Sequence, residues 1–264
     1  MNLRAMPVKM IAGVALLCEI GMAQDSVKGM QANAPTNIPK APPIEEIIRQ
    51  VNQTQVNRRI PSTYQVIRQY RLTGASHNSV EARVVAGLDF APGNNTYTIQ
   101  EREGSRRGTE VVRRVLEHEL QTSPQSKEKT NESLTANNYD FRYSGESSVD
   151  GHPCYVLGLN PKRKQKDLIS GKVWVDEQSF AVRRIEGDLA KSPSMWIRKV
   201  HVTLSFGDVN GSWLQTRLNA VADVRFIGTQ TLTSQLVDFR IPEVVAQKTP
   251  TVARIPGAAA FRQH

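Results

Sequence analysis

The segment from Asp150 to Asp188 constrains the fold most, because it contains three short strand patterns joined by turns. Cys154–Asn160 is almost entirely apolar. Val173 and Val175 alternate with Lys172, Trp174 and Asp176. A short polar turn then leads into Phe180–Ile185. A period of two places one set of side chains on each face of a sheet, and a short turn makes successive strands antiparallel neighbours. The segment therefore predicts an antiparallel sheet.

Strand patterns of the same kind occupy most of the remaining chain. Asn210-Gly211 is among the strongest hairpin signals in a sequence, because both residues tolerate the backbone that a tight turn needs. Together the patterns predict nine or ten strands. Those outside the first segment are Ser62–Gly74, Ser79–Phe90, Thr96–Glu103, Tyr139–Gly145, Lys199–Asp208, Trp213–Phe226 and Thr231–Phe239.

Two stretches have the spacing of amphipathic helices instead. They are Ile44–Arg59, which follows a Pro-Pro pair, and Thr109–Leu120. Each has one apolar stripe and a polar opposite side, so each must pack on another element, and the sheet is the available partner. The order helix, sheet, helix, sheet predicts the α+β class. The stripes consist of Ile44, Ile47, Ile48 and Val51, and of Val111, Val112, Val115, Leu116 and Leu120.

The first 23 residues have the pattern of a secretory signal peptide. Arg4 and Lys9 supply a basic region, Met10–Leu17 is apolar, and a small-x-small cleavage site ends at Ala23. Eight apolar residues are too few to span a bilayer, which takes about 20. We therefore expect secretion across the inner membrane and a periplasmic protein.

The chain then divides by composition. Residues 24–43 are rich in Asn, Pro, Ala and Gln and predict a flexible linker, and residues 243–264 predict a disordered tail. The folded domain is expected at residues 44–242. No lipoprotein anchor is expected at Cys18, because such sites need a small residue where Leu17 stands. Cleavage would leave Cys154 without a disulfide partner, and its apolar strand favours a small buried side chain over a reactive thiol.

The net charge of +9 is spread along the chain and is typical of a solvated surface, although it also favours anionic partners. Four cations gather in one strand connection, at Lys162, Arg163, Lys164 and Lys166. They are either a solvated connection or a contact for anionic headgroups. No aromatic residues are interleaved with them, so we expect no nucleic-acid partner.

No constellation of catalytic residues is found. The five histidines are scattered, and His118-Glu119 lacks the second histidine of a zinc-protease motif. The sequence has no nucleophile elbow and no phosphate-binding glycine loop. We therefore expect no enzyme, no catalytic residue, no metal and no cofactor.

Met195 and Trp196 lie in a Pro/Ser-containing connection between strands, where they either cap the core or line the mouth of an apolar pocket. The same choice, between packed core and cavity wall, applies to four aromatic residues of the strand patterns. These are Trp174, Phe180, Phe206 and Trp213.

Four segments resemble proteins of the LolA/LolB-like superfamily, the lipoprotein-sorting and sigma-factor-regulator proteins of the bacterial cell envelope. They are GHPCYVLGLNPK (Gly151–Lys162), LISGKVWVD (Leu168–Asp176), VRRIEG (Val182–Gly187) and GSWL (Gly211–Leu214). The resemblance covers about Ile44 to Pro242. It implies a strongly curved, unclosed antiparallel half-barrel whose concave face is covered by helices, with an apolar cavity for acyl chains between them.

The expected function is accordingly a periplasmic lipid- or lipoprotein-binding protein, a carrier or sorting factor that holds acyl chains in an apolar cavity. The alternative is an envelope-sensing regulator or scaffold that binds an envelope protein partner on the same curved sheet. Peripheral membrane contact is compatible with both. The expected headgroup contacts are Lys162, Arg163, Lys164 and Lys166, and the expected cavity residues are Val173, Val175, Met195, Trp196, Val202, Leu204 and Phe206.

Overall fold

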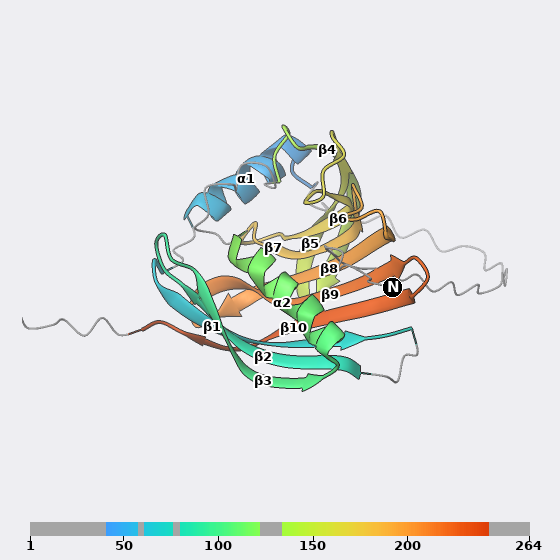
Figure 1. Cartoon of the computed structure of the whole chain (residues 1–264). Coiled ribbons are helices and arrows are strands. Elements are labelled where there is room, and N and C mark those ends of the chain that lie inside the picture. Colours follow the sequence, from blue (N-terminus) through green and yellow to red (C-terminus); the bar gives the residue numbers. More distant parts are fainter. Residues whose placement is uncertain (1–40, 58–60, 76–79, 122–133, 243–264) are drawn as a thin grey trace, which may run out of the picture.

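A single antiparallel sheet of ten strands organises the molecule (Figure 1). The computed structural model describes residues 41–57, 61–75, 80–121 and 134–242. The predicted signal peptide, nearly all of the linker and the tail lie outside these residues. The strands are β1 (Tyr64–Thr73), β2 (Val80–Phe90), β3 (Thr96–Gly104), β4 (Tyr139–Val149), β5 (His152–Pro161), β6 (Ile169–Asp176), β7 (Val182–Leu189), β8 (Ile197–Val209), β9 (Ser212–Val224) and β10 (Gly228–Arg240).

The strand order is β3-β2-β1-β10-β9-β8-β7-β6-β5-β4, and every pairing is antiparallel. Neighbours in the sheet are neighbours in sequence except at β1 and β10, whose pairing joins the first three strands to the last seven. The two edge strands, β3 and β4, do not pair with each other, so the sheet is open. The α+β class, the strand number and the unclosed, curved sheet are confirmed.

Two glycines of the concave face lie opposite each other on neighbouring strands. Gly171 of β6 lies opposite Gly187 of β7, which in turn lies opposite Val202 and then Ala220. A Cβ atom added to Gly171 would lie 2.0 Å from the Glu186 carbonyl oxygen. Glycines in a strand interior mark such close approaches of two backbones. Their missing side chains allow the strands to curl around the concave face.

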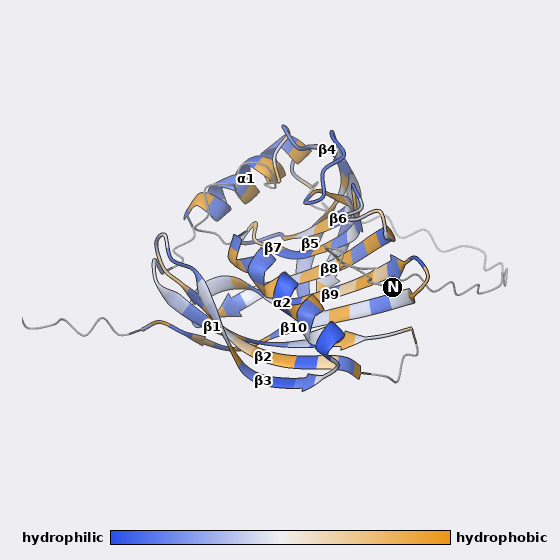
Figure 2. Cartoon of the chain, in the orientation of Figure 1, coloured by the Kyte–Doolittle hydropathy of each residue, from blue (hydrophilic) through white to orange (hydrophobic). Residues whose placement is uncertain are grey.

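Two helices cover this face, α1 (Ile44–Asn57) and α2 (Arg106–Gln121) (Figure 1). They divide its apolar side chains into two clusters. The α2 cluster joins Val112, Val115 and Leu116 to strands β1, β2, β6, β8, β9 and β10. The α1 cluster joins Ile47, Ile48, Val51 and Leu134 to strands β4 to β7. Figure 2 shows apolar and polar residues alternating along both helices, as amphipathic packing requires.

Several element boundaries differ from the sequence-based prediction, and three of them have a clear local cause. Helix α2 begins at Arg106, three residues early, because the Ser105 hydroxyl accepts the Gly108 N–H at 3.0 Å and caps the helix. Phe180 and Phe226 were expected in strands, but both lie in turns with positive φ, at 52° and 66°. Turn backbones of this kind usually carry Gly, Asn or Asp, so the two phenylalanines gave no turn signal.

The close approach at Gly171 gives the first testable prediction. Gly171→Ala should lower the free energy of unfolding by about 2 kcal/mol, because its Cβ would push two paired backbones apart. Gly158→Ala is the matched control, since its Cβ would meet its nearest neighbour at an ordinary 3.5 Å. Urea denaturation of both variants measures the difference. Equal stability of the two would contradict this account of the bend.

Candidate functional site

The concave face beneath α1 contains part of the predicted lipid-binding set. Val173 and Val175 of β6 are 1% and 0% exposed and belong to the α1 cluster. Phe206 of β8 is partly buried and packs against the same cluster. These three side chains are therefore brought together on one apolar surface, and the stripe of α1 covers it.

The other two predicted strand residues lie nearer α2. Val202 is a buried member of the α2 cluster, and Leu204 is partly buried against it. Ile185, which pairs with both Val173 and Leu204, packs against both clusters. The two halves of the concave face are thus continuous through Ile185.

Met195 and Trp196 are not part of either cluster. They lie in the β7–β8 connection at one end of the sheet, where Met195 is 76% exposed and Trp196 is half-buried. Trp196 contacts Phe226 of the β9–β10 turn, with ring centroids 6.2 Å apart. The structure separates these two residues from the five strand residues of the predicted set.

Two of the four cations in the connection between β5 and β6 are already held by partners within the protein. Lys162 forms an ion pair with Asp140 at 3.2 Å, and Arg163 donates to the Asn138 side-chain oxygen at 2.6 Å. Lys164 and Lys166 are exposed, and within the described residues neither has an ion pair. Arg163 therefore anchors the connection to the start of β4, and the two lysines remain available to an anion.

A buried polar group on the concave face was missed in the sequence. Arg68 of β1 is 7% exposed, and its guanidinium donates to the Ser234 hydroxyl at 3.0 Å and to the Gln215 carbonyl. It also lies 3.8 Å from Glu119 of α2, which accepts the Tyr70 hydroxyl at 2.6 Å. Burial, followed by the Glu119 charge, raises the pKa of Tyr70 well above 10. The alternation of this strand places Arg68 on the same face as Tyr64 and Val66. That position in the sequence was the signal that could have predicted its burial.

These polar contacts attach α2 firmly to the sheet. Besides the Glu119 contacts, Asn95 donates to the Leu120 carbonyl at 3.1 Å, and the Ser105 N–H donates to the Glu81 carbonyl at 2.7 Å. Helix α2 is thus tied at both ends. Moving α2 away from the sheet would leave the buried Arg68 charge without its partner Glu119. An unpaired buried charge is strongly destabilising, so this movement would be unfavourable.

Helix α1 is attached differently. In the part of the chain that the structure describes, one hydrogen bond joins it to the sheet, from the Thr54 hydroxyl to the Ser179 carbonyl at 3.2 Å. The rest of the contact is apolar: Ile47, Ile48 and Val51 are buried in the α1 cluster, and Ile44 is partly buried against it. The two covering helices therefore differ, and only α1 is held mainly by apolar contact.

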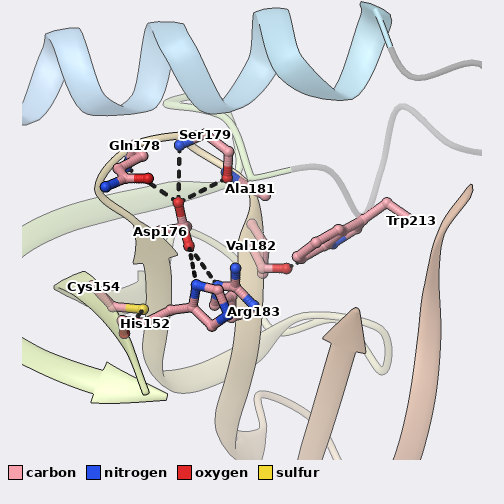
Figure 3. A network of polar contacts seen from close by, with 9 residues as sticks. All are labelled: His152, Cys154, Asp176, Gln178, Ser179, Ala181, Val182, Arg183 and Trp213. Carbon is pink, nitrogen blue, oxygen red and sulfur yellow. Dashed lines mark hydrogen bonds and ion pairs between the residues drawn. The ribbon is translucent and has the colours of Figure 1, made fainter. Parts of the chain in front are cut away.

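The β6–β7 turn that receives Thr54 is fixed by Asp176 (Figure 3). The Asp176 carboxylate accepts the Gln178 N–H at 3.1 Å and the Ser179 N–H and hydroxyl at 2.9 and 2.8 Å. Its other oxygen lies 2.5 Å from Arg183 Nε. Every turn donor near this buried carboxylate is satisfied, so the Ser179 carbonyl is held in place for α1.

The electrostatics of this network follow from the same contacts. Burial alone would raise the pKa of Asp176, but hydrogen bonds from Ser179 and Arg183 outweigh it and lower the pKa to about 2. Arg183 also stacks over the Trp213 ring at 5.2 Å, and Trp213 Nε1 donates to the Val182 carbonyl at 3.0 Å. Trp213 is thus a structural support of the turn.

Cys154 lies near this network (Figure 3). It is fully buried, its thiol donates to the His152 carbonyl, and burial together with Asp176 raises its pKa. A raised thiol pKa disfavours the reactive thiolate. The prediction of a small buried side chain is confirmed.

Neither a metal site nor a membrane-spanning helix is found within the described residues. No group of three or more His, Cys, Asp or Glu side chains there could hold a metal ion. Neither helix is long and apolar enough to cross a bilayer.

The Asp176 network gives a pH-dependent prediction. Because the pKa falls from 3.8 to about 2 on folding, the charged carboxylate should contribute about 2 kcal/mol above pH 4, lost as the pH falls toward 2. Asp176→Asn should lower stability by that amount at pH 7 and converge with the wild type in acid. Denaturation at several pH values measures this. Asp167→Asn, at an exposed position, is the control, and a pH-independent difference would contradict the assignment.

Several crystal structures are similar to this chain. A DUF1329 family protein from Desulfovibrio piger is 14% identical, with 78% of this chain and 96% of that chain covered and a TM-score of 0.41. A LolA superfamily protein from Nitrosomonas europaea is 14% identical, with 77% and 96% covered and a TM-score of 0.37. A putative outer membrane lipoprotein-sorting protein domain from Vibrio parahaemolyticus is 12% identical, with 77% and 95% covered and a TM-score of 0.40.

The second of these carries the name of the superfamily that the sequence resembles. With TM-scores below 0.5 and such low identities, the three similarities do not bear on what this chain binds. A search of curated protein sequences found no match. A protein-family model described as "-like: Uncharacterized protein" matches residues 108–240, which is just over half of the chain. The chain therefore belongs to that family.

Proposed function

We propose that this protein binds lipid or lipoprotein acyl chains on its concave face, beneath α1, and acts in the periplasm as a non-enzymatic carrier or sorting factor. The observation that supports this most is the attachment of α1. Three buried aliphatic side chains, the partly buried Ile44 and one peripheral hydrogen bond hold it over a continuous apolar surface. An acyl chain can replace such contacts, because apolar burial is non-directional.

The energetics favour long chains. Burying an aliphatic side chain contributes about 1.5–3 kcal/mol, and burying a methylene about 0.8 kcal/mol. The three side chains Ile47, Ile48 and Val51 are therefore matched by roughly eight methylenes in contact with the sheet. A palmitoyl chain exceeds this number, whereas a hexanoyl chain falls short of it. Only the longer chain would displace the helix.

The expected binding residues divide by position under this proposal. Val173, Val175 and Phe206 would contact an acyl chain directly under α1. Leu204 and Val202 would extend the apolar surface toward α2, which stays in place through its polar ties. In the basic connection, Lys164 and Lys166 would reach an anionic headgroup.

The alternative function is an envelope-sensing regulator or scaffold that binds a protein partner on the same curved sheet. It uses the same surface, but α1 does not have to move away from the sheet, because no lipid enters beneath it. A protein that copurifies with one stoichiometric protein partner and with no lipid would support it.

Locking α1 onto the sheet tests the lipid proposal. The double variant Thr54→Cys/Ser179→Cys places one thiol on α1 and one on the β6–β7 turn, at two residues that are now joined by the 3.2 Å hydrogen bond from the Thr54 hydroxyl to the Ser179 backbone carbonyl. Once oxidised, it should lose at least tenfold in affinity for a fluorescent palmitic acid derivative, because α1 can no longer move aside. A reducing agent should restore binding. The readout is a fluorescence titration, with disulfide formation verified by mass.

Both single cysteine variants are the controls, since Ser179→Cys alone also alters the contact with Asp176. A second variant, Leu204→Asp, should reduce palmitate binding while leaving the circular dichroism spectrum unchanged. Undiminished binding by the locked protein would contradict entry beneath α1. Absence of palmitate binding by the wild type would contradict the proposed function itself.

A further inference from the structure

Two loops at one end of the sheet expose large apolar side chains side by side. In the β7–β8 connection Met195 is 76% exposed, and in the β9–β10 turn Phe226 and Ile227 are 92% and 41% exposed. The loops are joined, since the Arg225 N–H donates to the Trp196 carbonyl at 2.8 Å and the Trp196 and Phe226 rings are in contact. We call Met195, Trp196, Phe226 and Ile227 the apolar tip. The β9–β10 turn is the orange-to-red hairpin end at the right of Figure 1.

The backbone of the tip holds its most exposed ring outward. Phe226 has φ of 66°, a left-handed conformation that is rare for a bulky residue and is usual for glycine. Packing offsets little of this cost, because Phe226 is 92% exposed and its ring meets the Trp196 ring in a tilted contact. Strained backbone conformations of this kind cluster at functional sites.

Positive charge surrounds the apolar tip. Arg225 and Lys191 are exposed and have no ion pair within the described residues. The basic β5–β6 connection opens at the same end of the sheet, since the Ala190 N–H donates to the Leu168 carbonyl at 2.7 Å. The three connections, 162–168, 190–196 and 225–227, carry six cations and one carboxylate. This end of the sheet is therefore both cationic and apolar.

We propose that this end of the molecule docks onto the surface of an anionic lipid bilayer, with the apolar tip inserted at the boundary between headgroups and acyl chains. Exposed apolar patches rimmed by polar residues mark interaction surfaces. Tryptophan and phenylalanine suit the interface of a membrane, and nearby lysines and arginines are attracted to anionic headgroups. The tip supplies insertion. The preference for negative charge comes from Lys164, Lys166, Lys191 and Arg225, which are exposed and have no ion pair within the described residues.

A bilayer fits these features better than a second copy of the chain. Two copies meeting through this surface would bring two sets of these unpaired cations together, and like charges across an interface are unfavourable. A bilayer with phosphatidylglycerol offers the opposite charge and an apolar layer beneath it. Docking does not depend on acyl chains entering beneath α1, so the two proposals can fail separately.

Phe226→Gly is the most informative variant. Glycine accepts the positive φ at no steric cost, so the variant should be as stable as the wild type or more stable. It should nevertheless bind vesicles of phosphatidylcholine with phosphatidylglycerol at least tenfold more weakly in a cosedimentation assay. Val237→Ser, which removes another exposed apolar side chain from β10, is the matched control and should bind like the wild type.

The charge requirement is tested in the same assay. The wild type should bind vesicles of phosphatidylcholine alone far more weakly, and raising the salt concentration should release it from the anionic vesicles. Arg225→Gln combined with Lys191→Gln should weaken binding to anionic vesicles and reduce the salt dependence.

Three results would overturn the docking proposal: no sedimentation of the wild type with anionic vesicles, equal binding by the wild type and Phe226→Gly, or a dimer that dissociates on Phe226→Gly without any vesicle binding. Palmitate titration of Phe226→Gly separates the proposals, since acyl binding beneath α1 should be unaffected by this variant.

Discussion

An open, curled sheet has a concave face that it cannot cover by itself, and the rest of this structure follows from that constraint. Closure into a barrel would remove both edges and enclose the interior. Here β3 and β4 remain unpaired, and the inward side chains of ten strands form an apolar surface that needs a cover. Two amphipathic helices provide it, and each can do so because its stripe matches the apolar face below.

The two helices differ in how they are fixed, and this difference gives the concave face two halves with different properties. Polar contacts to Glu119 and hydrogen bonds at both ends bind α2 to β1, β2 and the β2–β3 turn. Helix α1 rests on aliphatic side chains and touches one turn carbonyl, which the buried Asp176 network holds in place. Under the proposed function, the half beneath α1 is the one that a ligand would reach by competing for apolar contact.

Much of this architecture could be predicted from the sequence, for physical reasons. Period-two alternation and turn residues such as Asn210-Gly211 define local strands, and all strand pairings but one join neighbours along the chain. The pairing of β1 with β10 is a long-range contact and has no local signal. Both turns were predicted, but Phe180 and Phe226 were placed in the strands beside them, because a phenylalanine rarely adopts the positive φ that these two residues have.

The candidate site was predicted less completely than the fold. The apolar strand positions, such as Val173 and Val202, follow from alternation, which places them on the buried face. Alternation could not show that Met195 lies away from them, since the path of a connection is set by the loops it meets. Nor could it show that Arg68 has partners on three other elements, because those lie far away in sequence.

Hydrogen exchange measured by mass spectrometry tests the central claim most directly, because it compares the opening of the two helices within one molecule. If α1 is held mainly by apolar contact, peptides covering Ile44–Asn57 should exchange through a local opening, long before those covering Arg106–Gln121. Equal protection of both helices, lost only when the whole sheet unfolds, would contradict the claim that α1 can part from the concave face.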